Sequence, residues 1–444
     1  MFARAATIRT ERRDAVGLWC SKLMAMSSAL LSMIILNEHA KQIGAVYWKR
    51  GMGIGLFAFQ LPLLYWSFVG MEASFIAFLN LMQILAFLSW IQTEQRRDLW
   101  WFSVLGVLST MTRPEAILVY GFSWLWAVLF VRRTRQILES TVIFTILFGA
   151  FLLWRYSYYG FWLPNTFYAK VDRFGLALLQ KGLVYAALFC IPHILLLFPA
   201  IRTIVLRKGG NENLYLALLA FVQIAVVIFE GGDHYPAGRF FVPILPVLAL
   251  LWIHTDFEIP EAYSAVLVCA CCILTFAAGY FLRGYRAFES AAGGERGQFA
   301  SRWLVEHVPP NTSIATMSVG AVPYYTNLPT LDLVGLVDLH IGHAPVATGH
   351  GKIGHEKFDN NYVMQRKPGL FLFAPCYHTE EQLLKEAGGI LPMYDDLLRN
   401  HFPNPDYTFV SVKQPQACFS LLVRKDVAAR WKLDPNGLFV GMKN

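Results

Sequence analysis

The feature that most constrains this chain is a series of ten long apolar runs, in which apolar residues are continuous and do not alternate with polar ones. Only helices and closed barrels cross lipid, because every backbone N–H and C=O there needs a partner within the protein. Continuous runs predict helices. We therefore expect an α-helical polytopic membrane protein with about ten transmembrane segments, at roughly 17–36, 52–69, 73–91, 99–112, 116–131, 138–156, 178–200, 214–229, 240–254 and 263–282.

The composition excludes several other classes of protein. Charged residues make up 15% of the chain, against about 25% in soluble domains, which excludes a single soluble domain. The 56% hydrophobic content excludes a disordered or fibrous chain. Residues 1–282 hold 22 Lys/Arg and 15 Asp/Glu, whereas residues 283–444 hold 16 and 15. Because the excess positive charge lies in the apolar part, it favours membrane topology over a nucleic-acid partner.

Basic residues gather in alternate loops between the apolar runs. One set of loops carries Lys41, Lys49, Arg50, Arg96, Arg97, Arg132, Arg133, Arg135, Arg202, Arg207 and Lys208. The opposite loops carry Arg113, Lys170, Arg173 and Arg239. The positive-inside rule places the first set in the cytoplasm. Ten spans then place residues 283–444 outside.

The N-terminus conflicts with this topology. Residues 1–16 would also lie outside, yet they carry Arg4, Arg9, Arg12 and Arg13. We interpret the wrong sign of charge as a first run that does not span, or as missing upstream sequence. The expected division is an N-terminal segment at 1–16, a transmembrane core at 17–282 and a soluble domain at 283–444.

The polar C-terminal part is predicted to form an α/β domain, with strands at 312–317, 330–334, 370–374, 407–412 and 419–423 and helices at 298–307 and 379–387. An extracytoplasmic location would allow a disulfide between Cys376 and Cys418. The spacing of the nearby histidines matches no strong metal-ligand pattern, so we expect solvated or structural side chains and no metal site at His340, His343, His350 and His355.

Two candidate motifs lie at the ends of early apolar runs. Glu72, in Gly-Met-Glu, is either a solvated loop carboxylate or a site residue, because a carboxylate at a membrane interface is costly unless it is solvated or paired. Pro114 interrupts the next pair of runs between Arg113 and Glu115. These two side chains form a structural ion pair, or the planar guanidinium binds a phosphate in a bidentate way.

Two further motifs lie in the opposite loops. An aromatic stretch from Arg155 ends in Leu-Pro-Asn165-Thr-Phe-Tyr168-Ala-Lys170, where aromatic rings and polar groups suit a sugar face and a phosphate, although aromatic belts are common at membrane interfaces. The string from Glu230 to Pro243 holds Asp233, His234, Tyr235 and Arg239 within seven residues. A simple turn does not need so many polar groups, so this string favours a functional site.

The order and spacing of these strings resemble those of one family. They continue into Tyr324-Tyr325, Asp332-Leu-Val-Gly-Leu and Gly354-His-Glu-Lys357. The chain resembles the GT-C membrane glycosyltransferases of the bacterial terminal β-arabinofuranosyltransferase type and the related LphB-like membrane proteins, over residues 55–375. No single motif is specific. The resemblance implies a helical GT-C core with a periplasmic α/β domain, in the bacterial inner membrane.

The resemblance also implies an activity. Such enzymes move a sugar from a polyprenyl-phosphate donor to a hydroxyl of an envelope glycan or lipid. A carboxylate takes the acceptor proton, and cationic groups hold the phosphate leaving group. The candidate catalytic carboxylates are Asp233, Glu72 and Glu115, the phosphate-binding candidates are Arg113, Lys170 and Arg239, and the substrate-binding candidates are Asn165, Tyr168, His234 and Tyr235. No cofactor is specified, and a divalent cation is compatible with the chemistry.

One departure from the family keeps alternatives open. Members usually carry an acidic outer loop after their first transmembrane helix, and residues 1–50 show no such loop, since Asp14 is a poor match. We therefore expect that the chain lacks upstream sequence, or that it is an inactive or scaffold member. A transporter of lipid-linked glycans is a further alternative, although transporters place broken helices and charges near the midplane.

Overall fold

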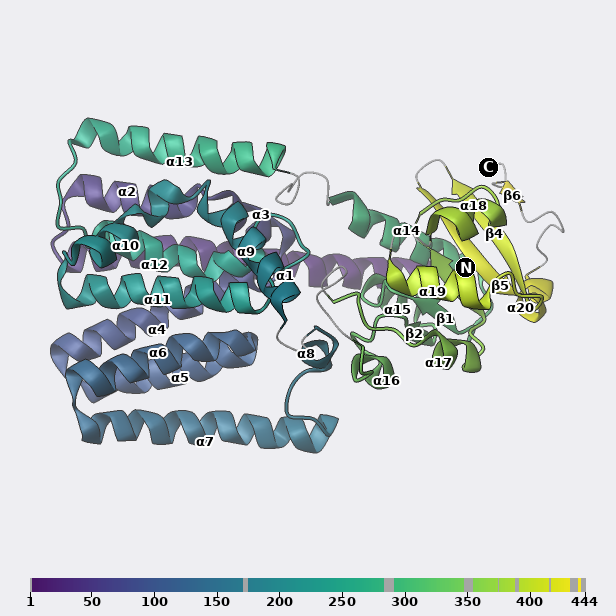
Figure 1. Ribbon diagram of the computed structural model, residues 1–444, viewed down its shortest axis with the longest axis horizontal. Coiled ribbons are helices and arrows are strands. Elements are labelled where there is room, and N and C mark those ends of the chain that lie inside the picture. The colour runs from purple at the N-terminus through teal and green to yellow at the C-terminus, as the bar shows by residue number, and fades with distance from the viewer. Residues whose placement is uncertain are drawn as a thin grey trace. The chain divides into compact units, whose positions relative to one another are not determined.

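The computed structural model describes residues 2–170, 175–282, 291–346, 354–373, 375–387, 391–414, 417–431 and 438–440. The chain divides into two compact units. The first comprises Met1–Gly160 and Gln180–Phe288, and the second comprises Phe161–Leu179 and Glu289–Asn444. Each unit is described by itself below (Figure 1). Two residues named above, Arg173 and His350, lie outside the described ranges.

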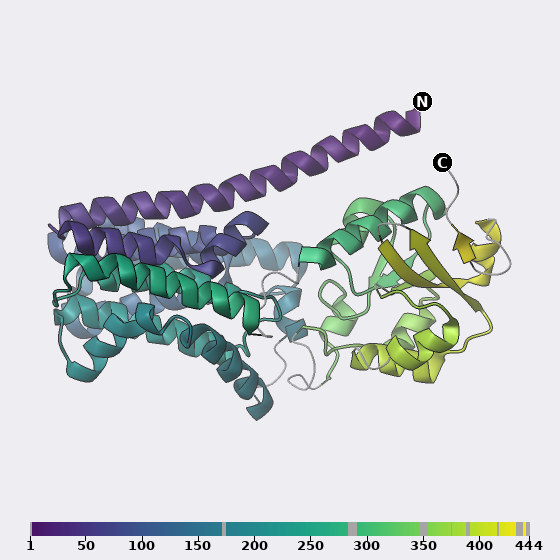
Figure 2. The same ribbon diagram turned by 90° about the horizontal axis from the view of Figure 1, so that it is seen from above.

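The first unit is a bundle of helices, in which α1 runs alongside α2 (Figures 1 and 2). Each of the ten apolar runs falls on a helix or on consecutive helices, which confirms the predicted helical class. The elements are α1 (Phe2–Gln42), α2 (Tyr47–Ala58), α3 (Leu61–Val69), α4 (Ala73–Thr93), α5 (Arg96–Thr112), η1 (Pro114–Ala116), α6 (Ile117–Trp126), η2 (Ala127–Val131), α7 (Thr134–Tyr159), α9 (Leu176–Cys190), α10 (Ile194–Leu206), α11 (Gly210–Phe229), η3 (Arg239–Ile244), α12 (Leu245–Ile253) and α13 (Glu261–Phe281).

The helices differ in their ability to cross a bilayer. Within the described ranges, six are long and apolar enough by themselves, and up to eight spans result if each bent pair counts as one. The bent pairs are α2–α3, with a 52° angle, and α9–α10, with a 105° angle. The segment Arg239–Ile253 is a shorter apolar helix, and α5, of 17 residues, begins with Arg96, Arg97 and Asp98. Their short length accounts for the difference from the expected ten.

The break at Pro114 separates two helices. Arg113 adopts an extended conformation, with φ −145°, and caps α5. Pro114 then opens η1, where a missing N–H and a fixed φ cost nothing. The chain therefore forms two helices, α5 and α6, which are joined through η1, with the buried Arg113 at the break.

The predicted basic loops meet at one end of the bundle. Arg133, in the connection before α7, pairs with Glu94, in the connection between α4 and α5, at 2.6 Å. Lys49 donates a hydrogen bond to the carbonyl of Thr255 at 2.6 Å. Further links at this end join Arg50 to Asn37, Gln92 to Glu212, Arg202 to Asp256, and His39 to His254. The loop assignment made from charge therefore groups residues that lie together in space.

The second unit is built on a mixed six-stranded sheet of order β2-β1-β3-β5-β4-β6. β1 is parallel to β2 and β3, whereas β5 is antiparallel to β3 and β4. Side chains alternate along β3, so that Phe371 and Phe373 enter one hydrophobic cluster and Leu370 and Leu372 enter the other. The strands are β1 (Ile314–Thr316), β2 (Thr330–Asp332), β3 (Leu370–Phe373), β4 (Tyr407–Gln414), β5 (Ala417–Arg424) and β6 (Leu438–Val440).

Helices cover this sheet and confirm the predicted α/β class of the domain. Cys376 and Cys418 form a disulfide, with their Cα atoms 5.1 Å apart. The helices of this unit are α8 (Asn165–Lys170), α14 (Ala291–His307), α15 (Ala321–Thr326), α16 (Leu339–Gly342), α17 (Asn360–Gln365), α18 (Glu380–Glu386), α19 (Pro392–His401) and α20 (Lys425–Arg430).

Candidate functional site

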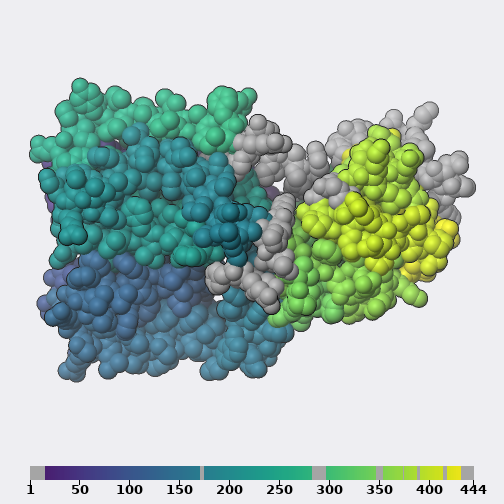
Figure 3. Space-filling model, in the orientation of Figure 1, coloured from purple at the N-terminus to yellow at the C-terminus, as the bar shows by residue number. Residues whose placement is uncertain are grey.

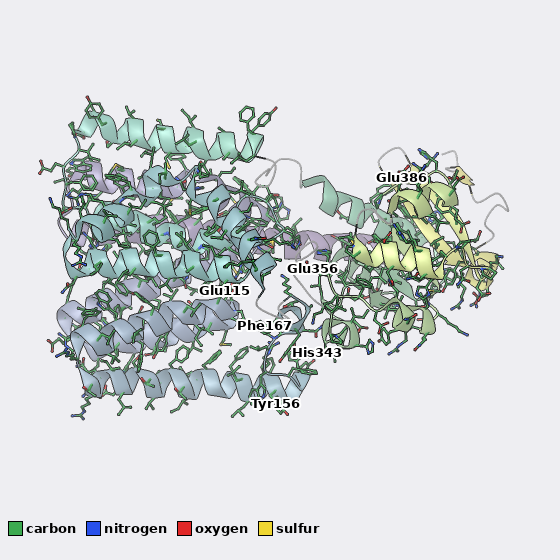
Figure 4. The ribbon with its side chains drawn as sticks, viewed as in Figure 1. Glu115, Tyr156, Phe167, His343, Glu356 and Glu386 are labelled. Carbon is green, nitrogen blue, oxygen red and sulfur yellow. A yellow bond between two sulfur atoms is a disulfide. The ribbon has the colours of Figure 1, made fainter. Side chains whose placement is uncertain are left out.

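A charged cluster lies at the end of the bundle opposite the basic loops. Arg113, which caps α5, donates from Nη1 to Glu72 Oε1 at 3.2 Å and also pairs with Glu115. The Arg113 side chain is 10% exposed, whereas those of Glu72 and Glu115 are 33% and 28% exposed. Figure 4 labels Glu115 at this end of the bundle. The structure thus joins residues from two predicted motifs around one guanidinium.

A second ion pair is almost fully buried. Arg239 Nε lies 2.8 Å from Asp233 Oδ2, and the two side chains are 8% and 1% exposed. Neither atom has a well-aligned hydrogen bond, so the contact is an ion pair. The other carboxylate oxygen of Asp233 accepts the backbone N–H of His234 at 2.9 Å. Buried charges require such pairing, because desolvation costs each ion several kcal/mol.

An aromatic ring connects the two clusters. The guanidinium of Arg113 stacks over Phe240 at 4.4 Å, and that of Arg239 lies 5.2 Å from the same ring. Arg239 also lies over Tyr235 at 4.8 Å and Trp66 at 5.6 Å. Aromatic faces stabilise a guanidinium and hold its plane. The two arginines therefore form one continuous site, with three aromatic rings as its walls.

A glycine pair sets the turn that carries Asp233. Gly231 and Gly232 adopt φ values of +80° and +79°, which only glycine adopts at low cost. A Cβ on Gly232 would lie 2.5 Å from the Tyr185 ring. The hydroxyl of Tyr185 in turn accepts the backbone N–H of Phe240 at 3.4 Å. Tyr185 therefore packs between the turn and the start of η3, and it supports both halves of the site.

A pocket opens beside the charged cluster. Its cavity volume is about 40 Å³, and it lies between α4, η1–α6, α11 and η3. Arg113, Glu115 and Glu230 lie on its wall, together with Asn80 and Gln223. The remaining lining is apolar: Ile76, Ala116, Leu118, Val119, Val226, Val227, Phe240 and Pro243. The lining therefore combines apolar side chains with charged and amide groups.

The polar side chains of this end differ in how many of their groups are already bound. Arg113 donates to two carboxylates, whereas the only hydrogen bond of the Arg239 guanidinium to a described residue runs from Nη1 to the sulfur of Met71, at 3.7 Å. The hydrogen bonds to Glu72 and Glu115 all end on Oε1 within the described chain. Arg239 can therefore accept a further anion, and each glutamate can accept a further proton.

Three predicted site residues belong to the second unit. Asn165 donates from Nδ2 to the carbonyls of Gly335 and Asp338, at 2.9 and 3.2 Å. Tyr168 stacks on the ring of His343, at 4.3 Å. A Cβ on Gly354 would lie 3.2 Å from Lys170 Cε. These contacts tie α8 to the loops around α16 (Figure 4), and they give Asn165 and Tyr168 structural partners.

The other tail motifs also have structural partners. Asp332 is buried and accepts backbone N–H groups of Val334 and Val337 at 2.9 and 2.7 Å; burial raises the pKa of its carboxyl group, whereas those hydrogen bonds lower it. Asp359 caps α17, and the backbone N–H of Tyr362, followed by the nearby His340, lowers its pKa.

The described acidic, histidine and cysteine side chains are not grouped as metal ligands. Throughout the described ranges, no group of three or more His, Cys, Asp or Glu residues is placed to hold a metal ion. At the candidate site the carboxylates are instead engaged by arginines. No step of the chemistry below is assigned to a metal.

Sequence reasoning missed several residues of the site. Asn80 and Gln223 lie within apolar runs, and Asn80 Oδ1 and Gln223 Nε2 are buried without hydrogen-bond partners. Polar residues inside a membrane span are functional candidates by default, so this signal was present. Tyr185 and Trp66 carried no such signal, because aromatic residues are common in apolar helices.

Comparisons with known proteins support the fold. A family described as "Domain of unknown function (DUF8728)" matches residues 286–430. No curated protein matches the chain in sequence. Among solved structures, ArnT from Cupriavidus metallidurans bound to undecaprenyl phosphate is similar, with a TM-score of 0.53 and 11% identity, over 91% of this chain and 84% of that one. The chain therefore has a GT-C-like fold, the fold of that glycosyltransferase.

Proposed function

We propose that this protein is a membrane glycosyltransferase that moves a sugar from a polyprenyl-phosphate donor to a hydroxyl of an envelope glycan or lipid. The observation that carries the proposal is the combination at one end of the bundle. A largely apolar pocket opens there beside two arginines and several carboxylates. An isoprenoid chain suits the apolar lining, and a guanidinium suits the phosphate.

Arg239 is the proposed ligand of the donor phosphate. Its side chain is pre-oriented by the Asp233 ion pair and by Trp66, Tyr235 and Phe240. Its Nη groups lack a strong acceptor among the described residues. As the bond from the anomeric carbon to the phosphate oxygen breaks, negative charge grows on the phosphate, and a fixed cation stabilises that charge. Arg113 is a second, carboxylate-bound cation beside the same ring.

Glu72 or Glu115 is the proposed general base. Within the described chain, each has one carboxylate oxygen without a hydrogen bond and is about a third exposed, so an acceptor hydroxyl can approach it. The base takes the hydroxyl proton while the acceptor oxygen attacks the anomeric carbon. Asp233, 1% exposed and paired, is better suited to position Arg239. Tyr235 lies against the Arg239 guanidinium and His234 packs on Tyr235; both are proposed to contact the sugar.

Two observations support the proposed donor and location. The structurally similar ArnT was bound to undecaprenyl phosphate, a polyprenyl phosphate. The Cys376–Cys418 disulfide favours an oxidising compartment for the second unit, since disulfides are rare in the cytosol. Basic loops that share the opposite end of the bundle favour the cytoplasm for that end. We therefore propose a bacterial inner-membrane protein with an extracytoplasmic C-terminal domain.

Binding of undecaprenyl phosphate tests the proposed donor site. The full chain is placed in nanodiscs, and the dissociation constant is compared between wild type and Arg239→Lys, which keeps the buried charge but loses the planar fork. We expect binding about tenfold weaker, since one charge-assisted hydrogen bond contributes roughly 1.5 kcal/mol. The matched control is Arg202→Lys, because Arg202 pairs with Asp256 at the opposite end. Equal affinities for wild type and Arg239→Lys would argue against this phosphate site.

Cell-envelope composition separates the transferase from the alternatives. Glu72→Gln and Glu115→Gln are tested singly in cells for loss of a glycan modification and in nanodiscs for donor binding. For a transferase, one of the two substitutions abolishes the glycan modification while binding of the donor persists. If deletion of the gene leaves glycan composition unchanged, a scaffold role replaces the transferase. If deletion instead makes lipid-linked glycans accumulate on the cytoplasmic leaflet, a transporter role replaces the transferase.

A further inference from the structure

A second lipid-sized groove runs between α5 and α7, away from the pocket described above. Its volume is about 510 Å³, and it shares no lining residue with that pocket. All of its lining is apolar: Val104, Val107, Leu108, Met111, Leu147, Phe151 and Trp154. Figure 3 shows this side of the bundle, where α4 to α7 appear in blue. The proposed transfer reaction does not use this groove.

The groove occupies one half of the helix pair. A hydrogen bond between the hydroxyls of Ser103 and Ser140, 2.8 Å apart, joins α5 to α7. The lining residues all follow these serines toward the ends of the helices that carry Arg113 and Tyr159. Eight residues of helix measure roughly 10 Å, about two thirds of the ~15 Å depth of one leaflet. The groove can therefore take a large part of one lipid tail.

A basic side chain lies at the end of this groove. Arg155 follows Phe151 by four residues, so it lies on the same face of α7 one turn further on. It stacks on Tyr159, at 5.2 Å, and makes no ion pair with any described residue. Its Nε is buried without a hydrogen-bond partner. An arginine near the end of a membrane helix can bind an anion at the level of the lipid headgroups.

We propose that this groove is a binding site for an anionic glycerophospholipid of the surrounding bilayer. One acyl chain lies against Leu108, Leu147 and Phe151, and the phosphate receives the Arg155 guanidinium. Charge complementarity selects an anionic head over a zwitterionic one, and the uniformly apolar lining selects a chain over a sugar. This site is independent of the proposed donor site, because it lies between α5 and α7, whereas the donor pocket lies between α4, η1–α6, α11 and η3.

Photocrosslinking in nanodiscs tests the site. The full chain is labelled with a diazirine phosphatidylglycerol probe, and the modified peptides are mapped. We expect labelling of 104–111 and 147–154 that unlabelled phosphatidylglycerol competes for about fivefold better than phosphatidylcholine, the preference that one interfacial basic residue gives. Arg155→Gln should abolish this preference, whereas Arg135→Gln, an exposed charge loss at the other end of α7, should leave it unchanged.

A steric pair of variants separates the groove from general lipid contact. Leu147→Trp fills the groove and should reduce labelling severalfold, whereas Ile146→Trp, at a 63% exposed neighbour outside the groove, should not. Labelling that is equal in both variants, or that phosphatidylcholine competes for equally, would overturn the site. Better competition by undecaprenyl phosphate than by phosphatidylglycerol would overturn its assignment to a bilayer lipid. Donor binding at Arg239 is measured separately, so the two proposals can fail independently.

Discussion

Removal of Arg113 tests the electrostatic account of the site. In Arg113→Met the apolar stem still packs on Phe240, but Glu72 and Glu115 lose their shared cation. Breaking a buried pair costs about 3–5 kcal/mol and breaking a surface pair about 0–1 kcal/mol. The arginine is 10% exposed and the glutamates about a third, so we expect a loss of about 2 kcal/mol. For a unit of this size that corresponds to a Tm lower by about 4 °C or less.

A compensating variant makes this prediction refutable. Glu72→Gln and Glu115→Gln, combined with Arg113→Met, remove the unpaired charges and should recover at least half of the lost stability. The assay is reversible unfolding in mixed micelles, followed by tryptophan fluorescence, with Arg202→Met as a charge-loss control at the opposite end. If the triple variant is less stable than Arg113→Met, the carboxylates are stabilised by something other than this arginine, and the reasoning is wrong.

Three further predictions concern other parts of the chain. Because the pKa of Asp359 is lowered in the folded state, its stabilisation of α17 is present above the unfolded pKa of about 3.9 and is lost as pH falls through the lower folded value. Hydrogen exchange of α17, corrected for intrinsic rates, should become faster as this stabilisation is lost. Asp359→Asn should make this pH dependence of exchange smaller. Gly232→Ala should destabilise the bundle by about 2 kcal/mol or more, because φ is +79° and the new Cβ would meet the Tyr185 ring; an unchanged Tm would contradict the described turn. Cys376→Ala with Cys418→Ala should destabilise the second unit by up to about 4 kcal/mol, given a sequence separation of 42 between the cysteines, and limited proteolysis would reveal it as faster cleavage there.

The helical class and the grouping of loops were predictable because each depends on local composition. A continuous apolar run has few alternatives to a helix in lipid, and each run lies on helical structure. Basic loops alternate along the chain, and antiparallel neighbours then bring them to one end, as Arg133 and Glu94 show. The same logic placed Glu72, Arg113 and Arg239 at the other end, although it did not pair them.

Pairing within the site depended on packing that the sequence does not record. Glu72 and Arg113 are 41 positions apart, and only the approach of α4 and α5 brings them to 3.2 Å. Tyr185 supports the Gly232 turn from the middle of an apolar helix, where it resembles its neighbours. Asn165 was expected among the substrate groups, yet its amide bonds to Gly335, 170 positions later, because α8 folds with the second unit.

The central claim is that a polyprenyl phosphate binds with its head at Arg239 and its tail along the apolar side chains of the adjacent pocket. The most direct measurement is a cryo-EM structure of the full chain in a nanodisc with undecaprenyl phosphate. The account predicts phosphate density within hydrogen-bonding distance of the Arg239 guanidinium, and chain density along Val119, Gln223 and Val227. Phosphate density at Arg155, with this pocket empty, would contradict it.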